Sequence, residues 1–141
     1  MDEVLREFDG KVRVVYKDLP LARHELAHGA HEAARCAGAA GRYWGYHDRL
    51  FAAQPAFDRP DLIRYAADLG IDASAFTRCL ESRQFAAEVD GDIAQARQLG
   101  IRGTPTFLIN GRRLVGAHPV ATFRDVINDA LGRRRDAEKE E

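Results

Sequence analysis

The segment from Gly100 to Ala117, GIRGTPTFLINGRRLVGA, restricts the fold more than any other part of the sequence. Asn110-Gly111 supplies the two consecutive positive φ angles that a two-residue type I′ turn requires. The β-branched and apolar residues on both sides of this turn predict a hairpin of strands at 106–109 and 113–115. Pro105 precedes the first strand although proline lacks the N–H used in a sheet, so this segment alone indicates a trans proline at an edge strand.

The remaining sequence predicts one further strand and a series of short helices. The β-branched run at residues 12–16, VRVVY, is compact enough to be a buried strand. Helices are expected where apolar residues recur at helical spacing, which is the case at 25–37, 43–51, 62–69, 76–80, 89–96 and 119–131. A strand, a helical block, a hairpin and a closing helix together indicate a single α/β domain.

Charge and hydropathy exclude several classes of function. With 21 basic and 22 acidic side chains the net charge is −1, which gives no electrostatic reason to expect a nucleic-acid partner. No apolar run reaches the length of a membrane span. The amino terminus, MDEVLREFDG, lacks the apolar core of a secretion signal, so the chain as written is expected in the cytoplasm.

The cysteines and histidines leave alternatives open. Cys36 and Cys79 are too far apart to form a CxxC pair, and both lie on apolar faces of predicted helices. They are either buried free thiols or one long-range disulfide. His24, His28 and His31 can share one helical side, as in a two-histidine metal site, but no acidic or cysteine partner has a fitting spacing. We therefore expect solvated or helix-capping histidines, no metal and no cofactor.

Four blocks of the chain resemble, in order and spacing, the DsbA-like thiol-disulfide oxidoreductases, a family with a thioredoxin fold and a helical insertion. The blocks are VRVVYKDLPLARHELAHGAHEAARCA, GRYWGYHDRLF, LGIDASAFTRCL and GIRGTPTFLINGRRLVGA, and the similarity covers about residues 3–131. The resemblance implies a thioredoxin-like part at 1–20 and 101–132, a helical insertion at 24–100 and a charged tail at 133–141.

The resemblance also implies roles for particular residues. In thioredoxin-like folds the proline before the corresponding strand is cis, and the residue before it offers its backbone to a peptide substrate. Pro105 would then be cis and Thr104 would bind substrate, with protein or peptide thiols and disulfides as partners. Some family members are said to carry a second disulfide in the helical domain, which would correspond to Cys36 and Cys79.

The chain departs from the family at its amino terminus. Family members begin with a central strand and carry CxxC at the start of the following helix, whereas this chain begins inside that helix, at MDEVLREF. Thiol-disulfide exchange needs a low-pKa thiolate and a resolving thiol, so no catalytic residue is expected in this chain. The resemblance thus predicts an oxidoreductase domain truncated at its amino terminus, with CxxC upstream of Met1, and inactive as it stands.

An alternative is a redox-inactive module for peptide binding or dimerisation. The missing central strand would leave two strand edges without a partner, and such edges attract other chains. A peptide, or a strand from a second copy in a homodimer, would fill the gap. The expected localisation is equally divided, because family members often work outside the cytoplasm.

Overall fold

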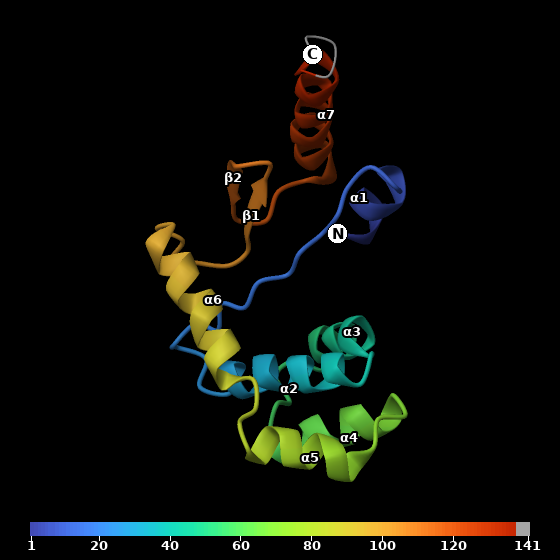
Figure 1. The fold of residues 1–141 in the computed structure, drawn as a ribbon, viewed down its shortest axis with the longest axis vertical. Helices are drawn as coiled ribbons and strands as arrows, with labels where there is room; N and C mark the ends of the chain where they lie inside the picture. The colour runs from blue at the N-terminus through green and yellow to red at the C-terminus, as the bar shows by residue number, and fades with distance from the viewer. Residues whose placement is uncertain (138–141) are drawn as a thin grey trace. The chain divides into compact units, whose positions relative to one another are not determined.

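The computed structural model describes residues 1–137 of the chain, and residues 133–137 of the predicted charged tail continue the last helix. The remainder of that tail, 138–141, lies outside the described residues. The chain divides into two compact units: unit 1 is Met1–Tyr16 with Ile101–Glu141, and unit 2 is Lys17–Gly100 (Figure 1).

Each unit has its own set of elements (Figure 1). Unit 1 contains helix α1 (Asp2–Glu7), strands β1 (Thr106–Ile109) and β2 (Arg112–Val115), and helix α7 (Val120–Ala137). Unit 2 is entirely helical in its regular elements, with α2 (Ala27–Ala39), α3 (Tyr43–Ala53), α4 (Arg59–Asp68), α5 (Ala73–Glu81) and α6 (Ala86–Gln98).

The predicted hairpin is confirmed in unit 1. β1 and β2 are antiparallel, with Thr106 opposite Val115 and Ile109 opposite Arg112. The connecting residues have positive φ angles of 47° at Asn110 and 86° at Gly111, as a two-residue turn requires. One face of the hairpin packs with α1 and α7 in a small apolar core, whose residues are Val4, Phe8, Phe107, Ile109, Leu114, Phe123 and Ile127.

The predicted strand at residues 12–16 is wrong. The segment has no helical structure, and its side chains alternate between half-buried and exposed, with Val15 65% exposed. Among residues 1–137 the sheet consists of β1 and β2 alone, so the segment joins no ladder. The β-branched pattern indicates an extended backbone, but a strand also requires a neighbour to exchange hydrogen bonds with it.

Unit 2 packs around the alanine-rich helix α2. Ala33 and Ala37 are completely buried, and their small side chains allow α3 and α5 to pack closely against α2. The buried Tyr46 on α3 donates its hydroxyl to the carbonyl of Leu62 on α4, at 2.8 Å. Burial raises the pKa of Tyr46, so this phenol stays protonated and keeps the two helices joined.

Candidate functional site

The residues immediately before β1, Gly103–Thr106, form what we call the proline loop. Its Thr104–Pro105 peptide bond is cis, as the family resemblance implied. Thr106 Oγ1 donates to the carbonyl of Gly103 at 2.7 Å, and the N–H of Gly116 donates to the carbonyl of Pro105 at 2.8 Å. The loop is therefore bonded both internally and to the residue that follows β2.

Thr104 has an exposed backbone position in this loop. Both Thr104 and Pro105 are exposed, and neither the N–H nor the carbonyl of Thr104 makes a hydrogen bond within the described residues. Every backbone amide needs a partner, which for an exposed group is water or another molecule. The structure thus places the two predicted substrate-binding residues side by side at the surface of unit 1.

Cys36 of α2 and Cys79 of α5 are joined by a disulfide in unit 2. The sulfur atoms are 1.99 Å apart, the Cα atoms are 6.0 Å apart, and the residues are only 5% and 9% exposed. Both cysteines of the sequence are thereby used, and no free thiol remains in the described chain. Since the attacking species in disulfide exchange is a thiolate, the bridged state supplies no nucleophile.

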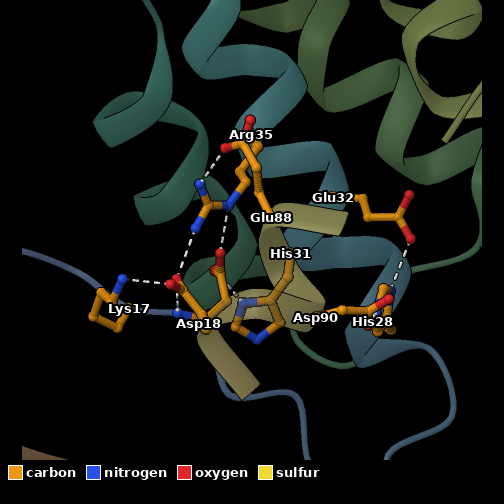
Figure 2. A network of polar contacts seen from close by, with 9 residues as sticks. Lys17, Asp18, His28, His31, Glu32, Arg35, Glu88 and Asp90 are labelled. Atoms are coloured by element: carbon orange, nitrogen blue, oxygen red, sulfur yellow. Dashed lines mark hydrogen bonds and ion pairs between the residues drawn. The ribbon is translucent and has the colours of Figure 1, made fainter. Parts of the chain in front are cut away.

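A cluster of charged side chains that the sequence analysis missed surrounds Asp18 in unit 2 (Figure 2). Asp18 is 2% exposed and accepts hydrogen bonds from His31 Nδ1 at 2.7 Å and Arg35 Nε at 2.5 Å, both from α2. The Arg35 guanidinium also donates to Asp92 at 2.7 Å and Glu88 at 2.7 Å on α6. Arg35 is therefore the cation shared by the carboxylates of this cluster.

Asp92 connects the same cluster to the backbone. Its carboxylate accepts the N–H of Asp18 at 3.0 Å and forms an ion pair with Lys17. We call the whole group the Asp18 cluster, and it consists of Lys17, Asp18, His31, Arg35, Glu88 and Asp92. It fixes the residues where the chain enters unit 2 onto α2 and α6.

The charges within the Asp18 cluster hold one another in the ionised state. Burial favours the protonated form of Asp18, but the hydrogen bonds from His31 and Arg35 outweigh it and lower its pKa. Burial likewise favours a neutral Arg35, but the hydrogen bond to Asp18 outweighs it and raises the pKa of Arg35. With both Asp18 oxygens bonded inside unit 2, the carboxylate acts as an anchor rather than as an acid or base.

A second group explains the histidine spacing. The two ring nitrogens of His28 lie 2.8 Å from Glu32 Oε1 and 2.9 Å from Asp90 Oδ1, and only the doubly protonated ring donates to both. The buried Glu32 also accepts from Arg83 at 2.8 Å. His28 thus joins α2 to α6, and no group of side chains suited to a metal occurs in the described residues.

The expectation of solvated histidines is therefore wrong for His28 and His31. Each ring contacts carboxylates, and Asp18 and Asp90 lie outside the helix that carries the histidines. His24 lies before α2 and accepts a hydrogen bond from Arg23 at 3.2 Å. Spacing along one helix could not reveal partners supplied by other segments.

Acid should weaken unit 2 through Asp18. Because its folded pKa lies below the unfolded value of about 3.9, its stabilisation is fully present above that value and is lost as pH falls through the folded pKa. Urea unfolding followed at several pH values should show the unfolding free energy falling more steeply below about pH 4 in the wild type than in Asp18→Asn. Parallel curves for the two proteins would contradict the lowered pKa.

The fold and the proline loop together define a thioredoxin-like α/β protein with a helical insertion. A solved structure, that of a thioredoxin-like oxidoreductase from Silicibacter pomeroyi DSS-3, matches with a TM-score of 0.81 and 26% identity, covering 93% of this chain and 75% of that one. The DSBA-like thioredoxin domain family matches residues 22–128. The chain therefore belongs to the DsbA-like thioredoxin family.

The most similar curated relatives include much longer proteins. The Na(+)/H(+) antiporter NhaA 1 of Salinispora arenicola is 35% identical over 134 residues, which are 94% of this chain and 20% of that protein. NhaA 3 of Salinispora tropica is 36% identical over 88% of this chain and 19% of its own length. The chain thus spans about a fifth of these relatives. Within residues 1–137, no helix combines the length and hydropathy of a transmembrane span.

Proposed function

We propose that this chain is a polypeptide-binding domain in which the proline loop holds an extended segment of a partner protein. The observation that carries the proposal is the exposed backbone of Thr104, whose N–H and carbonyl have no partner in the described residues. An extended peptide beside the loop would supply the missing donor and acceptor, as in other cases of strand addition. Membership of the DsbA-like family supports a protein or peptide as the partner.

The state of the cysteines supports binding without disulfide exchange. Cys36 and Cys79 are buried and bridged to each other, whereas exchange needs an accessible thiolate and a resolving thiol. We assign no catalytic residue to this chain. The antiporter activity in the relatives' names is not part of the proposal, because this chain corresponds to about a fifth of their length.

The proposal is tested by removing one backbone donor. Thr104→Pro deletes the Thr104 N–H and should weaken binding of peptides selected from a displayed random library about tenfold, the effect of one to two lost hydrogen bonds. Thr104→Ala keeps the N–H and should bind nearly as well as wild type. Fluorescence anisotropy measures both, with circular dichroism to verify folding. Failure to select any peptide, or equal binding by the two variants, would refute the proposal.

A second candidate function is thiol-disulfide exchange with a CxxC pair that lies outside residues 1–141. The observation that favours it is the likeness to a solved oxidoreductase, with a TM-score of 0.81. It predicts an in-frame CxxC upstream of the Met1 codon, and it predicts that the extended polypeptide oxidises reduced ribonuclease faster than the present chain does. An in-frame stop codon directly upstream, or an extended polypeptide without this activity, would exclude this candidate.

A further inference from the structure

β1 has one edge bonded to β2 and one open edge. In a hairpin closed by a two-residue turn, Ile109 and Arg112 form the hydrogen-bonded pair beside the turn. Because the pattern alternates, Phe107 also directs its N–H and carbonyl toward β2, while Thr106 and Leu108 direct theirs away. The bond from Gly116 to Pro105 continues the same alternation. Within the described residues no third strand covers the open edge.

The open edge lacks the features that usually protect a strand from pairing. Natural edge strands are blunted by inward charges, bulges or covering segments. The two residues whose backbone faces outward here, Thr106 and Leu108, are uncharged. Leu108 is 48% exposed, and Val115 beside it on the same face of the sheet is 65% exposed. This edge therefore combines free backbone groups with an apolar surface.

The surroundings of the open edge are positively charged. From Ile101 to Arg124 the sequence contains Arg102, Arg112, Arg113 and Arg124 and no acidic residue. Arg112 pairs with Asp129 at 3.5 Å, and Arg124 pairs with Glu7 at 2.8 Å. Arg102 is exposed shortly before Thr104 and forms no ion pair within residues 1–137, and Arg113 lies directly opposite Leu108 on the same face.

We propose that the open edge of β1 accepts an extended acidic segment of a partner protein as a third strand. The segment would place an apolar side chain beside Leu108 and carboxylates near Arg102 and Arg113. This inference rests on the proposed peptide binding at Thr104 and extends the bound segment along β1. A second copy of the chain fits less well, because pairing β1 with its own copy brings arginines from the two molecules together.

Charge preference is the first test. The probes are the fluorescein-labelled peptides EVEVTVEV and KVKVTVKV, which share an alternating pattern and differ in charge. In about 50 mM NaCl the acidic peptide should bind about tenfold more tightly, and the difference should shrink in about 500 mM NaCl because salt screens exposed charges. Arg102→Glu should reduce the preference severalfold. Arg42→Glu makes the same charge change on exposed Arg42 in unit 2 and should not.

The second test locates the bound strand by NMR. On adding EVEVTVEV, the amide signals of Thr106 and Leu108 should shift and become protected from exchange, while those of Phe107 and Ile109 already bond to β2 and should change little. Leu108→Pro removes an outward N–H without removing a bond to β2 and should weaken binding about tenfold, with the hairpin shifts of β2 as a check of folding.

The possible failures separate this inference from the proposed function. Equal affinity for the two peptides, with shifts confined to Thr104, would overturn the acidic third strand and leave peptide binding at the proline loop. Absence of binding to these peptides and to library peptides would overturn both. Protection of Thr106 and Leu108 in a peptide-free dimer, seen by light scattering, would assign the edge to a second copy and overturn the inference as well.

Discussion

Replacing Arg35 with alanine should lower the unfolding free energy by about 3 kcal/mol, the lower end of the range for a broken buried ion pair. Arg35 donates to both Asp18 and Asp92, whose residues are 2% and 7% exposed. Without the guanidinium these carboxylates retain His31 and Lys17 but lose the cation between them. Urea unfolding followed by circular dichroism at neutral pH measures the loss.

A matched control separates burial from charge. Arg59 pairs with Glu81 at 3.3 Å, and both side chains are 57% exposed. Arg59→Ala removes the same charge from an exposed pair, and such pairs contribute less than about 1 kcal/mol. Adding Asp18→Asn to Arg35→Ala should recover part of the lost stability, because it removes one uncompensated buried charge. Equal effects of the two arginine substitutions would show that the Asp18 cluster contributes no more than a surface pair.

Local sequence signals were sufficient for the hairpin and most helices but not for long-range pairing. Asn110-Gly111 determines its turn through the φ angles of two adjacent residues, so neighbours carry the information. The segment at 12–16 has an equally strong local pattern, yet a strand also depends on a partner elsewhere in the chain. The Asp18 cluster was missed for the same reason, since Arg35 lies 17 and 57 positions from its two aspartate partners.

The aromatic residues of α3 show a related limit. Tyr43, His47 and Phe51 form one stripe at helical spacing and were expected to face the core. The fully buried aromatic is Tyr46 instead, while Phe51 is 58% exposed. Tyr46 lies on the side where α4 offers the Leu62 carbonyl to its hydroxyl. Periodicity identifies the helix, but the neighbouring helices determine which of its sides is buried.

Whether Cys36 and Cys79 are bridged could not be decided from sequence, because it depends on the distance between two helices. In the chain-entropy description, closing a loop of 43 positions stabilises the folded state by about 4 kcal/mol. We therefore expect the double variant Cys36→Ala, Cys79→Ala to lose about that much in urea unfolding. Dithiothreitol should produce a similar loss in the wild type and leave the double variant unchanged, since that variant has no bridge to reduce.

The same pair of proteins tests whether the disulfide has a role beyond stability. The proline loop and β1 belong to unit 1, whereas both cysteines belong to unit 2. At temperatures where it remains folded, the double variant should therefore bind the acidic peptide with wild-type affinity, with or without dithiothreitol. A variant that folds but no longer binds would mean that the bridge takes part in recognition, and the assignment of a purely structural disulfide would be wrong.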